Sequence, residues 1–230
     1  RRSDIYPKIY LPLKAGRYFN FEPSVGVRQT TYHTSDFTDS SGDSTDIRTR
    51  EIYDLGATIS SKIIRIFKPD SGWADKLKHE VIPEVTYGFT PYIDQSDLPY
   101  FNGDDRISES NKVTWSLTNN FITKKMHPGP NGEDRAAYRD VAYLKLSQSY
   151  DIKKERDDET QPFSDMSLEA EFDPSRYLTM DTDIDWDPYD DRFTKLTAGG
   201  TIKDNRGDSL RTEYRYKHTS LESLYSKLNI

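Results

Sequence analysis

The chain has 230 residues, a formal net charge of −7 and no cysteine. The acidic balance argues against a nucleic-acid-binding surface, and the lack of cysteine excludes a disulfide framework within this chain. Hydrophobic residues make up only 33% of the chain while aromatic residues reach 13%, a combination that fits neither a disordered chain nor an ordinary soluble core. No apolar run approaches the roughly 18 residues of a membrane helix, but a transmembrane barrel strand exposes only every second residue to lipid and escapes such a search.

Apolar and polar residues alternate with period 2 along most of the chain, which predicts β-strands. The first strand is expected over Ile5–Leu13, where Pro7 and Pro12 remove ladder hydrogen bonds and mark it as weakly paired. The second strand is expected over Tyr18–His33. A long polar loop that ends near Thr49 separates it from a third strand, which carries Tyr53, Leu55, Ala57, Ile59 and Ile63 on one face.

The stretch His79–Phe121 predicts one wide hairpin. In its first strand Val81, Val85 and Phe89 share one parity, and Glu84 and Thr86 share the other. The middle, from Tyr92 to Asn111, is polar, and its part Tyr92–Ser110 is expected to lack regular strand over most of its length. We expect it to lie at the same end of the sheet as Thr34–Thr49.

Six more strands follow the hairpin. The sixth is expected around Ala142–Tyr150, followed by a charged loop at Lys153–Asp158 and a seventh strand around Met166–Phe172. The others are expected around Leu178–Asp187, Leu196–Ile202 and Leu210–Tyr216, with the last starting at Leu224. No segment shows the 3.6-residue period of a helix.

About eleven strands joined by short turns predict an all-β, antiparallel up-and-down arrangement. The second, fourth and sixth connections are the longest and most polar, an asymmetry that outer-membrane barrels show. A soluble antiparallel sheet with one solvated face is the alternative, but an apolar face rich in Tyr, Phe and Trp near the strand ends favours the aromatic girdle of a membrane barrel. The strand count is odd, so we expect residues 1–230 to form part of the wall of one barrel domain and not to close a barrel alone.

Two motifs carry a resemblance to a known family. Pro83, Tyr87, Pro91 and Tyr92 precede the run Asp94, Gln95, Ser96 and Asp97, and a second motif consists of Asp105, Arg106, Ile107, Asn111 and Thr114. With these motifs the chain resembles the LPS-assembly outer-membrane proteins, the LptD or organic-solvent-tolerance family. The likeness is strongest over residues 79–125. The chain departs from the family's pattern because it shows no periplasmic domain and no cysteines and is too short for the whole barrel.

The resemblance implies a Gram-negative outer-membrane transport component with no enzymatic activity and no cofactor. It implies lipopolysaccharide as substrate, an LptE-like lipoprotein plug inside the lumen, the outer membrane as location, and no nucleic acid. The loop Asp94–Arg106 would then contact the plug or close the external mouth. The plainer reading is a folded loop stabilised by Asx turns at Asp94, Asp97, Asn102 and Asp104.

Charge patterning predicts which face of the late strands is the lumen. A turn at Pro188–Arg192 would pair Asp185 with Lys195 and Asp183 with Thr197, and a turn at Asp204–Asp208 would bring Thr201 near Arg211. Because an Arg or Lys facing lipid at the midplane costs roughly 2–4 kcal/mol, the charged residues should share the lumen face. The lumen-facing residues are predicted to be Asp183, Asp185, Lys195, Arg211 and Arg215. The outer face would carry Leu178, Met180, Ile184, Leu196, Ala198, Leu210 and Tyr214.

Other kinds of site have less support. The carboxylates of Asp181, Asp183, Asp185 and Asp187 lie about 7 Å apart on a straight strand, too far to share one metal ion. His33, His79, His127 and His218 stand in no pattern that suggests a catalytic triad. Two alternative functions stay open: a general diffusion pore and a soluble β-domain that binds carbohydrate.

Overall fold

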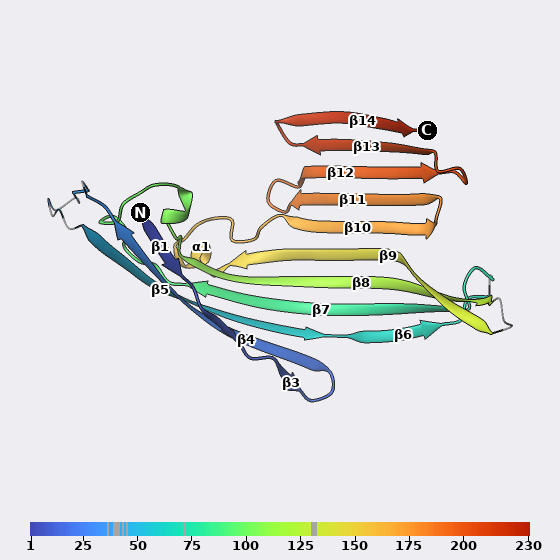
Figure 1. Ribbon diagram of the computed structural model, residues 1–230, viewed down its shortest axis with the longest axis horizontal. Coiled ribbons are helices and arrows are strands. Elements are labelled where there is room, and N and C mark those ends of the chain that lie inside the picture. The colour runs from blue at the N-terminus through green and yellow to red at the C-terminus, as the bar shows by residue number, and fades with distance from the viewer. Residues whose placement is uncertain (36, 39–41, 43, 45, 71, 130–132) are drawn as a thin grey trace. The chain divides into compact units, whose positions relative to one another are not determined.

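In a computed structural model the chain is all-β, with antiparallel strands connected up and down (Figure 1). The structure describes residues 1–230 except 36, 39–41, 43, 45, 71 and 130–132. The early strands are β1 (Arg2–Ile5), β2 (Lys8–Tyr10), β3 (Leu13–Ala15), β4 (Phe19–His33), β5 (Ile47–Ser61), β6 (Ile63–Phe67) and β7 (Lys76–Thr90). The later strands are β8 (Ser110–Pro128), β9 (Asp134–Asp151), β10 (Met166–Ser175), β11 (Leu178–Asp187), β12 (Arg192–Lys203), β13 (Ser209–Lys217) and β14 (Leu221–Asn229).

Hydrogen-bonded neighbours follow the order β1-β4-β5-β7-β8-β9-β10-β11-β12-β13-β14, which confirms a path of eleven strands. The predicted first strand is broken into β1, β2 and β3, all paired with β4, and the breaks contain Pro7 and Pro12. Proline has no N–H to donate, so the regular ladder is interrupted at each of them. The predicted third strand is interrupted at Lys62, after which β6 pairs with β7. Among the described residues β1 and β14 do not pair with each other, as predicted.

The chain divides into two compact units. The first unit consists of residues 1–59, 85–113 and 150–162. Its most buried side chains are Thr30 and Tyr32 of β4, Arg50 and Ile52 of β5, and Asp105 of the connection between β7 and β8. A loop therefore supplies part of this small core.

The second unit consists of residues 60–84, 114–149 and 163–230 and contains the hairpins from β10 to β14. Asp185 pairs with Lys195, Asp183 with Thr197, and Thr201 with Arg211, so the predicted register is confirmed. The register shifts between Asp185 and Trp186, where a β-bulge precedes the turn.

One short helix and two boundaries differ from the sequence predictions. The charged loop contains a one-turn helix, α1 (Ile152–Arg156), because the Asp151 side chain caps the backbone N–H groups of Lys153 and Lys154. A five-residue helix is too short to show a 3.6-residue period. The polar loop ends before Ile47, and the last strand starts at Leu221 instead of Leu224. Within the described residues, no helix has both the length and the apolar character needed to cross a membrane.

Candidate functional site

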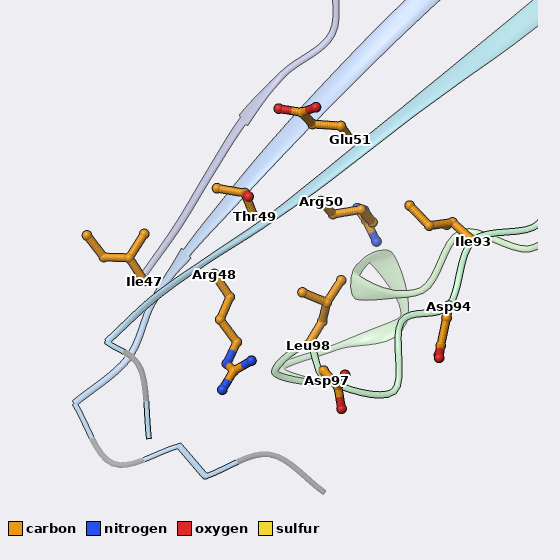
Figure 2. A pocket seen from close by; sticks show the side chains of 9 residues that line it. All are labelled: Ile47, Arg48, Thr49, Arg50, Glu51, Ile93, Asp94, Asp97 and Leu98. Carbon is orange, nitrogen blue, oxygen red and sulfur yellow. The ribbon is translucent and has the colours of Figure 1, made fainter. Parts of the chain in front are cut away.

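The connection between β7 and β8, residues 91–109, contains no strand and only one short 3₁₀ turn, η1 (Gly103–Asp105). It folds against the start of β5, where a cavity of about 380 Å³ lies between Ile47–Glu51 and Ile93–Leu98 (Figure 2). The connection from β4 leads directly into the start of β5, which is also the part of β5 on which residues 91–109 pack. Both long connections therefore lie at one end of the first unit, as predicted. Positions 36, 39–41, 43 and 45 of the connection from β4 lie outside the described residues.

Arg50 and Gln95 join this loop to β5. The Nη1 of Arg50 donates to the Oε1 of Gln95 at 2.8 Å and to the carbonyl oxygen of Asp105 at 2.8 Å, and its Nη2 donates to the Oγ1 of Thr30 at 3.0 Å. Gln95 also exchanges hydrogen bonds with the backbone of Ile107, at 2.8 and 3.0 Å. One guanidinium and one amide therefore connect two strands with both arms of the loop.

Asp105 fixes the tip of the loop. Its carboxylate accepts hydrogen bonds from the backbone N–H groups of Phe101, at 2.6 Å, and Asn102, at 2.8 Å, and from Nη1 of Arg2 at 2.8 Å. The side chain is fully buried. Burial opposes ionisation, but the hydrogen bonds from Arg2 and the backbone outweigh it and hold the pKa of Asp105 below its usual range. The loop tip is thereby tied to β1.

The other motif residues support the loop from within. Arg106 donates to the carbonyl oxygens of Leu98, at 2.9 Å, and Pro99, at 3.2 Å. The predicted Asx turn at Asp94 is present, because its carboxylate accepts from the N–H of Ser96 at 2.9 Å. Asp97 is exposed and lines the cavity with Asp94.

Two further positions complete the motif residues. Asn111 lies in β8, just beyond the loop, and its Oδ1 is buried without a hydrogen-bond partner in the described part of the chain. The side chain of Asp104 lies outside the described residues.

The loop covers one particular face of the first unit. Arg48 and Arg50 project from β5 toward the loop in Figure 2, whereas Ile47, Thr49 and Glu51 point to the other side of the strand. On β4 the ring of Tyr32 stacks on Phe101 with centroids 6.3 Å apart. Period-2 alternation places Asp54 and Thr58 on the same side as Arg50, so the loop packs on the polar face of β5.

A second long connection joins the same assembly. Arg156 of α1 forms an ion pair of 2.9 Å with Glu109, and Lys112 of β8 forms one of 3.3 Å with Asp151. Exposed ion pairs of this kind contribute little individually. Together they connect the start of the loop after β9 with the end of the loop after β7.

The sequence patterns did not identify Arg2, Thr30, Tyr32 or Arg50 as partners of the motif loop. The one indication in the sequence was that Arg50 alternates in phase with Asp54 and Thr58, the polar residues of its strand. Their contacts join residues up to 103 positions apart, which no local pattern encodes.

In the second unit, the register places the predicted charged residues on one face, which we call the charged face. Directly paired residues of an antiparallel sheet share a face. Its rows run Asp185–Lys195–Lys217, Asp183–Thr197–Arg215, Asp181–Gly199–Glu213 and Thr179–Thr201–Arg211 across β11, β12 and β13. The rows between these point to the opposite side of the sheet, which we call the apolar face. They include Ile184–Leu196–Tyr216 and Leu178–Ile202–Leu210.

Arg211 is the centre of an ion-pair cluster on the charged face. Its Nη1 lies 2.9 Å from Oδ1 of Asp181, and its Nη2 lies 2.6 Å from Oε2 of Glu213, which also pairs with Arg215. Gly199 lies between these side chains: a Cβ there would come within 2.5 Å of Asp181 Oδ2 and 2.8 Å of Arg211 Nη2. The glycine thus leaves room for the ion pair.

The remaining predicted positions do not form a metal site. Asp185 accepts a hydrogen bond of 2.6 Å from Ser167, and Asp183 lies opposite Glu169 of β10. Within the described residues no three His, Asp or Glu side chains are arranged to hold a metal ion. The ion pairs of the charged face centre on Arg211 and Glu213.

The chain is 24% identical to an LPS-assembly protein LptD of Nitrosococcus oceani, over 97% of this chain and 31% of that protein. It is 23% identical to the LPS-assembly protein LptD of Pseudomonas putida, over 96% of this chain and 27% of that protein. The chain therefore spans about a third or less of the length of these curated relatives. Because the family LPS transport system D (LptD) matches residues 1–230, the whole of the sequence, the chain belongs to the LptD family.

Proposed function

We propose that the chain forms part of the wall of an outer-membrane β-barrel that inserts lipopolysaccharide into the outer leaflet. The observation that carries this proposal is the match of the LptD family to residues 1–230. The relatives are named LPS-assembly proteins, and the apolar face of the second unit bears exposed side chains such as Met180, Ile202 and Leu210, as a lipid-facing wall would.

In this proposal the charged face lines the lumen and has a physical, non-covalent role. Lys, Arg and Asp side chains would keep the passage hydrated, so that the sugar and phosphate portion of lipopolysaccharide can pass beside them. Acyl chains would leave through an opening between strands. The ion pairs of Arg211 with Asp181 and Glu213 would keep this surface close to neutral and avoid trapping an anionic substrate.

The loop of residues 91–109 would narrow the external mouth. It packs on the polar face of β4 and β5 and is held by buried contacts from Arg50 and Arg2. Loops that line a wide lumen are also the surfaces available to a lipoprotein plug, and the exposed Tyr92 and Tyr100 offer aromatic contacts to such a partner.

Depletion of the full-length protein in its host tests the proposal. We expect labelled lipopolysaccharide to disappear from the cell surface, and the full-length protein to restore it. Unchanged surface lipopolysaccharide after depletion would contradict the proposal. A steady open current from the purified protein in a planar bilayer would favour a general diffusion pore instead.

A further inference from the structure

One end of the second unit is basic although the chain as a whole is acidic. Residues 62–78 and 121–139, which we call the basic end, contain nine Lys and Arg residues and four Asp and Glu residues, a formal net charge of +5 within a chain of −7. It comprises β6, the start of β7, the end of β8 and the start of β9.

The two hairpin ends of the basic end are held together. The backbone N–H of Asp75 donates to the carbonyl oxygen of Lys124 at 2.9 Å, the Asp75 carboxylate accepts from the N–H of Met126 at 2.6 Å, and Nζ of Lys125 donates to the carbonyl oxygen of Gly72 at 3.0 Å. Figure 1 shows these strand ends side by side. The two hairpin ends therefore lie next to each other.

The strands here are longer than a membrane crossing requires. β8 has 19 residues and β9 has 18, whereas a tilted transmembrane strand needs about 9–11. The pairing of β9 with β10 stops at Ala142 and Phe172, so β9 extends beyond it from Asp134 to Val141. In a membrane barrel this extension would emerge at the head-group level of one leaflet.

Apolar side chains give way to charged ones near this end of β6 and β7. On one face of β6 and β7, Ile63 pairs with Val81, and the next pair on that face is Arg65 with His79. The Arg65 guanidinium stands over the Phe67 ring, 5.0 Å from its centroid. Trp73 and Tyr138 are exposed nearby in sequence, at the turn and at the start of β9. Exposed aromatic rings mixed with Lys and Arg are typical of a membrane interface.

Two of these cations are available to a ligand. Arg65 and Lys68 are exposed and form no ion pair within the part of the chain that the structure describes, and Arg65 lies on the same face as Ile63 and Val81. By contrast, Arg211 and Arg215 of the charged face are paired with carboxylates. Unpaired surface cations beside interfacial aromatics attract anionic lipid head groups.

We propose that the basic end binds the phosphate groups of anionic phospholipids in the membrane leaflet next to the short turns. This inference rests on the proposed function, since it requires the sheet to be part of a membrane barrel. An acidic protein partner would pair with the cations. It would not explain why the apolar pair Ile63–Val81 and exposed aromatic residues accompany them.

The test compares lipid selection by the full-length protein in nanodiscs of phosphatidylethanolamine mixed with phosphatidylglycerol. The variant is Arg65→Gln/Lys68→Gln, and the matched control is Lys154→Gln/Lys195→Gln, which removes two charges elsewhere. Native mass spectrometry measures retained phosphatidylglycerol, and heat-modifiable gel migration checks that each variant is folded. We expect the variant to lose about tenfold or more of its preference for phosphatidylglycerol and the control to change by less than about twofold.

Three results would overturn the inference. Equal lipid preference in the variant and the unaltered protein would do so, and so would equal losses in the variant and the control. A photoreactive group at Trp73 that crosslinks to an acidic protein instead of lipid would assign the surface to a protein partner. Failure of the protein to insert into any bilayer would overturn the proposed function as well, which separates the two failures.

Discussion

Arg50 in β5 donates a hydrogen bond of 2.8 Å to the side-chain oxygen of Gln95, which lies 45 positions later in the motif loop. Arg50 is only 2% exposed, and Gln95 is half-buried. Leaving a buried donor or acceptor without its partner costs more free energy than the hydrogen bond contributes to stability. This pair is therefore one of the links that hold the loop on β5.

Replacing Arg50 with alanine should release the loop. The change removes the Arg50 hydrogen bonds to the Oε1 of Gln95, the carbonyl oxygen of Asp105 and the hydroxyl of Thr30, and we expect the free energy of local loop opening to fall by about 2–4 kcal/mol. Hydrogen exchange of the amides from Gln95 to Ile107 measures this opening. Thr49→Ala, a neighbouring exposed position on the other side of the strand, should leave exchange unchanged. Equal exchange in both variants would contradict the link.

The loop should loosen in acid through Asp105. Its pKa is depressed in the folded state, so its contribution to stability is present above the ordinary carboxyl pKa near 4 and is lost as the pH falls through the folded pKa. A spin label at Tyr100→Cys should report constant mobility from neutral pH to about pH 5 and increasing mobility well below pH 4. Asp105→Asn should make the label mobile already at neutral pH. A variant with an immobile label at neutral pH would show that Asp105 does not hold the tip.

Two adjacent glycines provide a matched test of the ion-pair cluster. A Cβ at Gly199 would meet Asp181 and Arg211 at 2.5 and 2.8 Å, whereas at Gly200 the nearest atom would be 4.0 Å away. We expect Gly199→Ala to destabilise the barrel by about 1 kcal/mol, because flexible side-chain ends must shift, and Gly200→Ala to be neutral or slightly stabilising. Urea unfolding in detergent or liposomes measures both. A Gly200→Ala change with the larger cost would contradict the geometry.

Charge placement should distinguish the two faces of β11. Ile184→Arg puts a cation on the apolar face and should cost roughly 2–4 kcal/mol near the midplane, which would impair assembly of the barrel. Asp185→Arg, the adjacent position, faces Lys195 on the charged face and should lose only a modest amount through repulsion. The yield of heat-modifiable protein in the outer membrane compares them. Similar yields would argue against a lipid-facing side.

The sequence was sufficient to predict the late strands because their turns are short. A turn at Pro188–Arg192 leaves few registers, and period 2 then sets which side chains share a face, so the pairing of Asp185 with Lys195 followed directly. The prolines in the first strand likewise predicted weak pairing, and the structure breaks at both of them.

The candidate site was only partly predictable. The motif identified Gln95 and Asp105, but their partners Arg50 and Arg2 lie on distant strands whose approach depends on the fold of the whole unit. The helix α1 was missed because its signal is one capping residue, Asp151, and not a periodic pattern. Local alternation predicts strands and faces; it carries no information on where a long loop will pack.

Thiol accessibility at two neighbouring residues tests the central claim, that the charged face lines an aqueous lumen and the apolar face contacts lipid. Asp185→Cys and Ile184→Cys are introduced separately into the full-length protein, and intact outer membranes are treated with a charged maleimide. Our account predicts rapid labelling of Asp185→Cys and protection of Ile184→Cys, which should instead react with a lipid-soluble reagent. Protection of Asp185→Cys together with labelling of Ile184→Cys by the charged reagent would contradict it.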